Sequence, residues 1–374
     1  MQKPSKVRPT SATALWQARA RYQAGMLAQS EASCTKILAV EPDHIDAIYL
    51  LGVVQARSDR WQEALATFDR VLALKADFPE ALANRGIALG RLGRLDEAAN
   101  SIAKALTIRP NYAEACYNYG QILFQMKCFT DAAAQYEKAS MLKPNYSEAL
   151  YGHGNVLRVM QRYQEALVSF QKFLAIKPND AEALNICGLT LQRLRRFTEA
   201  VASFDRAIAI KPDFVDALTN RGTAVQELGR FEEAFREFDK ALSLRPDFAE
   251  ARFNKGLLCL MLGRHGEARD AFETGIKLSP RKSDFYLGLS MCKRFAADDP
   301  LIPAMEDLAR DETLDVEERI KLGFALSKVL RDIGHFDRAF SQVLQASKLK
   351  RARITYDEGA ALAFFEYLPA IFSS

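Results

Sequence analysis

The sequence lacks an excess of charge of either sign, and it lacks long apolar runs. Its 51 basic and 47 acidic side chains leave a formal net charge of only +4 over 374 residues, which disfavours a nucleic-acid binder because such proteins usually carry a basic face or stripe. No apolar run is long enough for a membrane helix. The first ten residues are basic and polar, and no signal-peptide core follows them. We therefore expect a cytoplasmic protein that binds neither nucleic acid nor a membrane.

The residues that build metal and catalytic centres are also sparse and scattered. The six cysteines form no CxxC pair and the four histidines lie far apart, so neither set has the ligand spacing of a zinc site. We expect the cysteines to be buried thiols in a reducing compartment. A GxxxxGK[ST] phosphate loop is missing, and Gly152-His153-Gly154 is a lone GxG within a helical segment. The sequence predicts no catalytic residue, no cofactor and no metal.

The sequence does contain a period of 34 residues: proline, glycine and alanine each recur at this spacing, at fixed distances from one another. The frame contains the prolines Pro42, Pro110, Pro144, Pro178, Pro212, Pro246 and Pro280, with Ala76 in the remaining slot. It contains the glycines Gly52, Gly86, Gly120, Gly154, Gly188, Gly222 and Gly256, and the alanines Ala64, Ala98, Ala132, Ala166, Ala200, Ala234 and Ala268. A fixed period of this length indicates a solenoid with two helices per repeat.

With the proline at position 32, eight repeats cover residues 11–282. Apolar residues at i, i+3, i+4 and i+7 predict two amphipathic helices in each repeat. Positions 8 and 20 carry small residues, for example Gly222 and Ala234 in repeat seven. We expect the two helices of a repeat to cross closely at these positions. Position 24 is mostly aromatic, and we interpret it as core.

The junctions between repeats suggest helix capping. Position 33 is Asp or Asn at every junction, and an acidic residue follows three positions later, at position 2 of the next repeat. This spacing is similar to a capping box, in which such side chains bond free amides at a helix start. The alternative is that the acidic residues line a groove.

Together, the glycine, alanine, aromatic and proline positions resemble the tetratricopeptide repeat, TPR, over about 270 residues. The resemblance implies an all-α fold: a right-handed superhelical solenoid of antiparallel helix pairs, with the first helix of each pair lining the concave face. Repeat one departs from the pattern, with Ala18 and Ser30 at the two small positions, as terminal repeats often do.

The repeat pattern fails after Pro280. We expect residues 283–319 to form irregular helices broken at Pro300 and Pro303, residues 320–353 to form a degenerate TPR-like hairpin, and a last helix to run over 356–368. The first ten residues are expected to be a disordered basic segment.

Several stretches of residues 283–374 resemble the linker of bacterial TPR–sulfotransferase proteins. They are Lys293-Arg294-Phe295-Ala296-Ala297-Asp298-Asp299-Pro300, Phe324-Ala325-Leu326-Ser327-Lys328, Gly334-His335-Phe336-Asp337-Arg338-Ala339-Phe340 and Leu349-Lys350-Arg351-Ala352. In that family the linker leads into a sulfotransferase domain, which opens with a glycine-rich phosphate loop. On this resemblance the printed sequence, which ends at Ser374, is expected to lack that domain.

The groove is the expected binding site. Position 6 holds Asn84, Asn118, Asn220 and Asn254, and a similar asparagine ladder in O-GlcNAc transferase holds an extended peptide. An amide both donates and accepts hydrogen bonds, so it can pair with any peptide unit; the alternative is that Asn tolerates an exposed helix position and bonds water. The candidate anchors are Tyr117, Tyr151, Asn155 and Arg158, with Arg57, Arg91 and Arg193 at neighbouring positions.

The leading hypothesis is therefore a non-enzymatic scaffold that binds an extended peptide or a partner protein in this groove. The alternative is the substrate-recognition half of a truncated or split sulfotransferase, which would be inactive alone.

Overall fold

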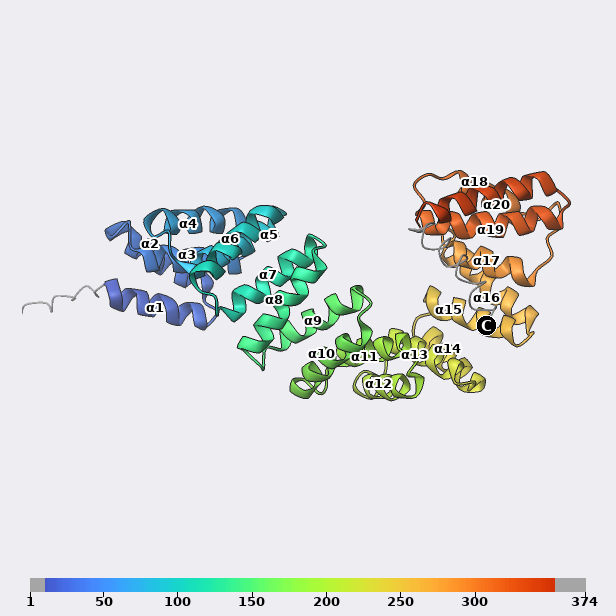
Figure 1. Cartoon of the computed structure of the whole chain (residues 1–374), viewed down its shortest axis with the longest axis horizontal. Helices are drawn as coiled ribbons and strands as arrows, with labels where there is room; N and C mark the ends of the chain where they lie inside the picture. The colour runs from blue at the N-terminus through green and yellow to red at the C-terminus, as the bar shows by residue number, and fades with distance from the viewer. Residues whose placement is uncertain (1–10, 354–374) are drawn as a thin grey trace, which may run out of the picture. The chain divides into compact units, whose positions relative to one another are not determined.

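The structure, a computed structural model, describes residues 11–353, which form twenty helices and no strand (Figure 1). The predicted disordered segment 1–10 and the predicted helix 356–368 lie outside the described residues. The predicted all-α fold of paired helices is confirmed.

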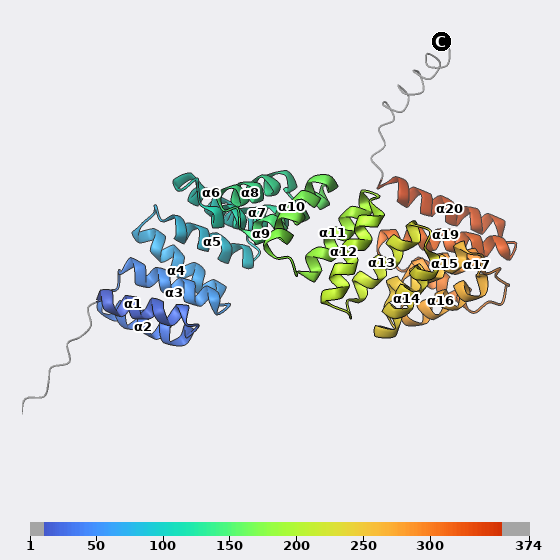
Figure 2. The same ribbon diagram turned by 90° about the horizontal axis from the view of Figure 1, so that it is seen from below.

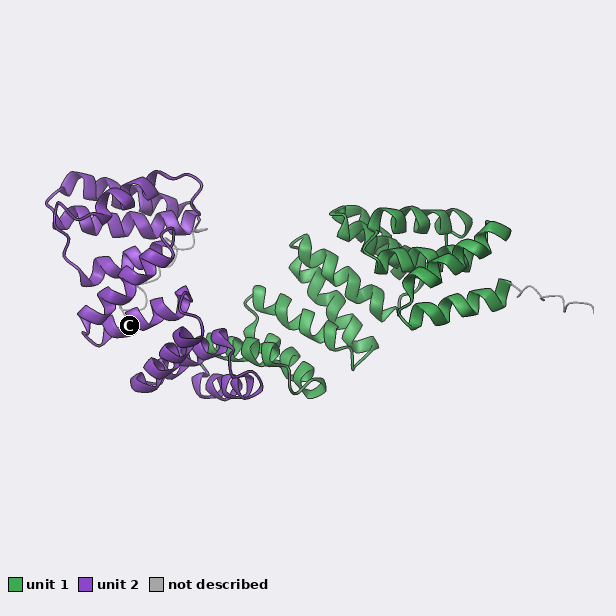
Figure 3. Ribbon diagram, turned by 180° about the vertical axis from the view of Figure 1, so that it is seen from behind, with its two compact units in different colours: residues 1–195 green, residues 196–374 purple. Residues whose placement is uncertain are grey.

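The chain divides into two compact units, residues 1–195 and 196–374 (Figure 3). Unit 1 contains the helices α1 (Ser11–Gln23), α2 (Leu27–Val40), α3 (Ile45–Arg57), α4 (Trp61–Leu74), α5 (Pro79–Arg91), α6 (Leu95–Ile108), α7 (Ala113–Gln125), α8 (Phe129–Leu142), α9 (Ser147–Val159), α10 (Tyr163–Ile176) and α11 (Ala181–Arg193). Unit 2 contains α12 (Phe197–Ile210), α13 (Val215–Glu227), α14 (Phe231–Leu244), α15 (Ala249–Met261), α16 (His265–Leu278), α17 (Ser283–Cys292), α18 (Leu301–Arg310), α19 (Val316–Asp332) and α20 (Phe336–Arg351). The boundary falls inside the sixth sequence repeat, 181–214.

The lengths of the helices follow the 34-residue repeat. From α1 to α16, each first helix has 13 residues and each second helix 14, so every intervening turn falls at the same repeat position. The residue at position 15 has a positive φ: Gly25, Gly93, Gly229 and Gly263 in four turns, and Asp59, Lys127, Gln161 and Arg195 in the others. Glycine adopts this conformation without strain, whereas a positive φ raises the conformational energy of other residues.

The small residues are required by close helix crossings, as predicted. A Cβ atom on Gly222 would lie 2.6 Å from Cε1 of Phe238, and one on Gly154 would lie 2.6 Å from Cε1 of Phe170. The aromatic side chains at position 24 are core: Phe68, Phe170, Phe204, Phe238 and Phe272 are all 0% exposed.

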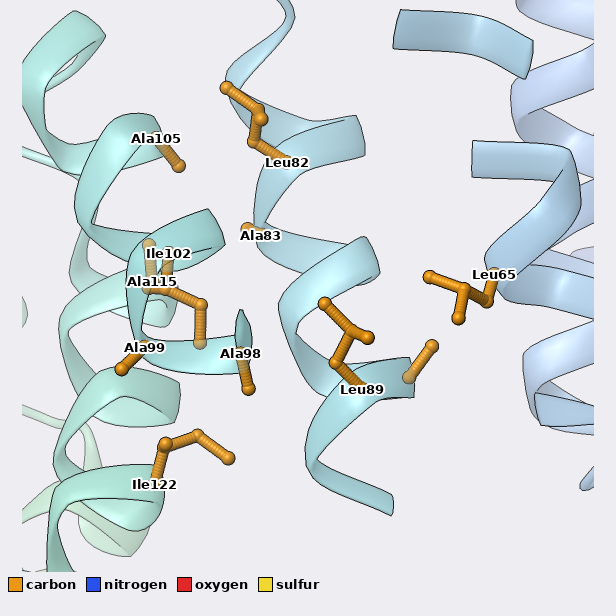
Figure 4. Packing of buried hydrophobic residues seen from close by; sticks show 11 residues of the cluster. Leu65, Leu82, Ala83, Leu89, Ala98, Ala99, Ile102, Ala105, Ala115 and Ile122 are labelled. Carbon is orange, nitrogen blue, oxygen red and sulfur yellow. The ribbon is translucent and has the colours of Figure 1, made fainter. Parts of the chain in front are cut away.

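Neighbouring repeats also pack on one another through clusters of buried apolar residues. Figure 4 shows one cluster to which α4, α5, α6 and α7 all contribute, including Leu65, Leu89, Ile102 and Ile122. From α1 to α11 in unit 1 and from α12 to α17 in unit 2, successive helices pack side by side in the order of the chain, whereas α17 packs on α19, which also contacts α18 (Figures 1 and 2). This is the nearest-neighbour packing of a helical solenoid.

The capping-box prediction is wrong for most first helices. The Asp or Asn at position 33 precedes the N-cap, which is position 34, and the aromatic N-caps Phe78, Tyr112, Tyr146, Phe214 and Phe248 make no side-chain cap bond. Asp180 at position 34 does cap α11, accepting from the amide of Ala183 at 2.8 Å. The sequence pattern was displaced by one residue from the true helix start.

The region after the repeats is more regular than predicted. Pro303 lies inside α18 as its third residue, where it interrupts no helical hydrogen bond because the first amides of a helix have no partner. The predicted break at Pro303 is therefore wrong, whereas Pro300 does precede the helix. In the α19–α20 hairpin, Gly334 turns with φ +82° and Ala339 is buried, as a repeat turn and a small position require.

Candidate peptide-binding surface

The predicted binding residues lie on first helices. We define the first-helix face by repeat positions 2, 5, 6, 9, 12 and 13. In unit 1 it carries Asn84 on α5, Tyr117 and Asn118 on α7, and Tyr151, Asn155 and Arg158 on α9; in unit 2 it carries Asn220 on α13 and Asn254 on α15. All eight side chains are half-buried, so each is held by its neighbours and still reaches the surface.

The asparagines at position 6 differ in what they bond. The Nδ2 group of Asn84 donates to the hydroxyl of Tyr49 at 2.8 Å, which links two neighbouring repeats. The amides of Asn118 and Asn254 make no hydrogen bond within residues 11–353. These two amides therefore keep both donor and acceptor available to a ligand or to water.

The tyrosine anchors are more deeply embedded than the sequence suggested. The Tyr117 ring lies 5.1 Å from the Tyr146 ring and 5.9 Å from the Tyr136 ring, between centroids. The Tyr151 ring packs edge-on against Phe170 at 5.9 Å. Burial raises the pKa of both hydroxyls. Each ring is thus part of the core, and the Tyr117 hydroxyl accepts a hydrogen bond from Nε2 of Gln121 at 2.9 Å.

Arginines follow the C-terminal ends of the first helices in unit 1. The Arg57 guanidinium lies 5.5 Å from the ring centre of Tyr22, and the Arg91 guanidinium 5.6 Å from that of Trp61. Arg158 has a buried Nε atom without a hydrogen-bond partner. The helix macrodipole favours cations at these ends, and the ring contacts add cation–π attraction for Arg57 and Arg91.

Carboxylates occupy the opposite end of the same helices, at position 2. Glu80 pairs with Arg109 at 2.7 Å, Glu114 with Lys143 at 3.3 Å, and Glu148 with Lys177 at 3.2 Å. Each basic partner stands at position 31 of the same repeat. These three carboxylates, predicted to serve in helix capping, are therefore engaged in ion pairs within their own repeats.

Two features of the structure were not predicted from the sequence. An arginine at position 16, the N-cap, pairs with the glutamate three residues on; Arg94 and Glu97 are joined by two bonds of 2.6 and 2.7 Å. A cavity of about 700 Å³ is lined by residues of α4, α5 and α6, such as Asp69, Arg85 and Lys104. The repeated R-x-x-E spacing in the sequence could have indicated the first feature. None of the eight predicted binding residues lines the cavity.

Other kinds of site receive no support from the described residues. No group of three or more His, Cys, Asp or Glu side chains there could hold a metal ion, and none of the described helices is long and apolar enough to cross a membrane. All six cysteines are free; Cys128 and Cys292 are half-buried and the other four are buried.

Comparison with known proteins agrees with the geometry. Family models described as tetratricopeptide repeat match residues 21–84, 79–102, 91–151, 151–213 and 219–283. The C-terminal part of a TPR repeat-containing protein from Cytophaga hutchinsonii superposes with a TM-score of 0.55 at 16% identity, covering 64% of this chain and 99% of that one. This likeness shows the fold alone.

Two other solved structures are similar over a shorter part of the chain. YrrB, described as a TPR protein with an unusual peptide-binding site, matches at 24% identity with a TM-score of 0.48, over 50% of this chain and 97% of its own. MamA matches at 26% identity with a TM-score of 0.42, over 44% of this chain and 96% of its own. No curated protein matches the chain.

Proposed function

The chain belongs to the tetratricopeptide repeat family, and from this premise we propose that it is a cytoplasmic, non-enzymatic scaffold. Proteins built on this repeat generally mediate protein–protein interaction. The ligand is an extended peptide or an extended segment of a partner protein, bound along the first-helix face. The residues proposed to contact it are Asn84, Asn118, Asn220, Asn254, Tyr117, Tyr151, Asn155 and Arg158.

The observation that supports this proposal best is the state of the position-6 amides. Asn118 and Asn254 stand at the same repeat position, are half-buried, and have no hydrogen-bond partner within residues 11–353. The same helix positions elsewhere are occupied by apolar or small residues, so an amide is not needed for packing there. An amide that both donates and accepts pairs with a peptide unit irrespective of its side chain.

The anchor residues Tyr117, Tyr151 and Arg158 are proposed as a second source of binding energy. The hydroxyl edges of Tyr117 and Tyr151 sit on rings fixed by aromatic neighbours, so little conformational entropy is lost when a ligand contacts them. Arg158 lies one helical turn after Asn155 on the same helix, α9. Binding energy would come from several such shallow contacts, because first-helix positions present side chains without a deep pocket.

The proposal is tested by selecting peptides from a displayed random library with the purified chain, then measuring their affinity. The variant carries Asn118→Ala, Asn220→Ala and Asn254→Ala. Each lost hydrogen bond weakens binding by roughly 0.5–1.5 kcal/mol, so we expect the triple variant to bind about tenfold to a hundredfold more weakly. The matched control replaces three exposed asparagines outside the first helices, Asn100→Ala, Asn111→Ala and Asn179→Ala. Equal affinities for both variants would contradict the proposal.

A second candidate function rests on the linker-like stretches of residues 293–352. Phe295 in the first stretch is 3% exposed, its amide lies 3.4 Å from the Oδ2 atom of Asp332, and Lys293 pairs with Asp299 at 2.7 Å. These contacts support a linker that is folded onto unit 2. On this candidate the chain is the recognition half of a sulfotransferase, inactive alone.

The second candidate is tested in the DNA downstream of the coding sequence. A frame encoding a strand followed by a glycine-rich phosphate loop would favour it. The purified chain should show no sulfate transfer in either case, so only the absence of such a frame counts against this candidate.

A further inference from the structure

We infer that the first-helix face of unit 1 selects an acidic peptide through a row of arginines. This inference rests on the proposed function and names the chemistry of its ligand. The arginine row consists of Arg57 on α3, Arg91 on α5, Arg158 on α9 and Arg193 on α11, at repeat positions 12 and 13. Arg57, Arg91 and Arg193 are exposed, and Arg158 is half-buried.

The row is unusual because it has no carboxylate partners. Among the described residues, none of its four guanidiniums makes an ion pair within the salt-bridge distance. Most other arginines of unit 1 do: Arg60, Arg94 and Arg162 each pair with a glutamate three residues on. An Arg158 Nε atom that is buried and without an acceptor is costly unless a ligand supplies one.

The rest of the same face does not cancel this charge. The position-2 carboxylates of α3, α5, α7 and α9 are ion-paired: Asp46 with Arg19 at 3.5 Å, Glu80 with Arg109 at 2.7 Å, Glu114 with Lys143 at 3.3 Å and Glu148 with Lys177 at 3.2 Å. On these four helices the charge of the first-helix face without an ion pair is therefore positive and belongs to the arginine row, which favours an anionic ligand.

Two guanidiniums of the row are held beside aromatic rings. The Arg57 guanidinium lies 5.5 Å from the ring centre of Tyr22 and donates to its hydroxyl at 3.4 Å, and the Arg91 guanidinium lies 5.6 Å from the ring centre of Trp61. Their remaining N–H groups can donate to a carboxylate. In unit 2 the row ends, because position 13 there is Glu227 or Met261. The acidic specificity is thus confined to unit 1.

The spacing of the repeats gives the spacing of the ligand's acidic residues. Neighbouring packed helices lie about 10 Å apart, and an extended chain rises about 3.3 Å per residue. Arg57 and Arg91, on the contacting helices α3 and α5, therefore match acidic residues about three positions apart. A peptide is favoured over a nucleic acid because amide-bearing residues accompany the arginines on the same face and the chain has little net charge.

The experiment uses the full chain and three fluorescein-labelled peptides of fifteen residues, alike except that every third residue is Glu, Gln or Lys. Fluorescence anisotropy should give the order Glu tighter than Gln tighter than Lys, with affinity for the Glu peptide falling as salt is added. A variant with Arg57→Gln, Arg91→Gln and Arg193→Gln should bind the Glu peptide about tenfold to a hundredfold more weakly, since exposed charge pairs contribute up to about 1 kcal/mol each.

The matched control removes the same charge from the second helices, as Lys36→Gln, Lys104→Gln and Lys172→Gln. These three lysines are exposed, and all stand at position 26. Equal losses in both variants would show a nonspecific charge effect and overturn the inference. Tighter binding of a single-stranded DNA of fifteen nucleotides than of the Glu peptide would also overturn it, in favour of a nucleic acid.

Failure of the inference is distinguishable from failure of the proposed function. If library-selected peptides lose affinity for the asparagine variant but are indifferent to the arginine variant, the first-helix face binds peptides without selecting acidic ones. If the Glu peptide and all library peptides fail to bind, both are wrong. Circular dichroism of each variant establishes that the helices are retained.

Discussion

Replacing Gly275 by alanine tests the tightest helix contact described. A Cβ atom at this position in α16 would lie 2.2 Å from both Cδ1 and Cε1 of Phe285 in α17. Ordinary contacts are about 3.5–4.0 Å, so the ring would have to retreat by more than an ångström. Phe285 is 0% exposed and packs edge-on against Phe253 at 6.0 Å, which leaves it no free space.

Overpacking of this kind costs roughly 1–3 kcal/mol, and the change from glycine to alanine returns roughly 0.5–1 kcal/mol in a helix. We expect a net loss of about 1 kcal/mol in the free energy of unfolding. The matched control is Gly266→Ala in the same helix, where a Cβ would meet nothing within 4 Å; it should be neutral or stabilise by up to about 1 kcal/mol.

The assay is urea unfolding followed by far-UV circular dichroism, with the slopes compared so that only stability differs. The double variant Gly275→Ala/Phe285→Ala restores the alanine pair that most other repeats use, such as Ala241 and Ala251. We therefore expect its loss to be smaller than the sum of the single losses by about 1–2 kcal/mol. Additive losses, or a Gly275→Ala variant as stable as Gly266→Ala, would refute the packing argument.

Two further predictions concern unit 1. Gln161 holds φ +60° in its turn, so Gln161→Gly should stabilise by roughly 0.5–1 kcal/mol while the reverse change at the equivalent turn, Gly93→Gln, should destabilise; thermal unfolding of both variants checks the signs. Burial lowers the pKa of His153, whose Nδ1 lies 3.1 Å from the Ser169 hydroxyl. Below about pH 6.5 the unfolded chain therefore binds the proton more readily, and stability falls as pH falls. His153→Gln should reduce that fall between pH 7.5 and 5.5, and an identical pH profile for the variant would show that His153 does not cause it.

The helices were predictable because the repeat is a steric pattern. Gly222 and Phe238 occupy positions 8 and 24 because one side chain fills the space that the other leaves, and such a pair recurs visibly in sequence. Helix starts were less predictable. An Asp at position 33 looks like a cap in sequence, whereas the real N-cap is one residue later and is often aromatic, as at Tyr112. A shift of one residue is invisible to a pattern of polar residues.

The candidate site was predictable as a set of positions but not as a set of contacts. Asn84 and Asn118 share position 6, yet only the structure separates the amide that bonds Tyr49 from the one that bonds no described residue. The sequence likewise did not show which charged side chains form ion pairs. Glu148 pairs with Lys177, the residue that caps the C-terminus of α10, 29 residues away, whereas Arg91 lies over the ring of Trp61 and has no ion pair among the described residues. Ion pairing depends on helix crossing geometry, which the repeat frame alone does not give.

The most direct test of the central claim is photo-crosslinking of a library-selected peptide that carries a benzophenone side chain, with the crosslinked residues mapped by mass spectrometry. The account predicts crosslinks on the first helices, at α7 and α9 around Asn118, Tyr151 and Arg158. Crosslinks concentrated on the second helices, for example on α4 and α6 around the cavity that they line with α5, would contradict it.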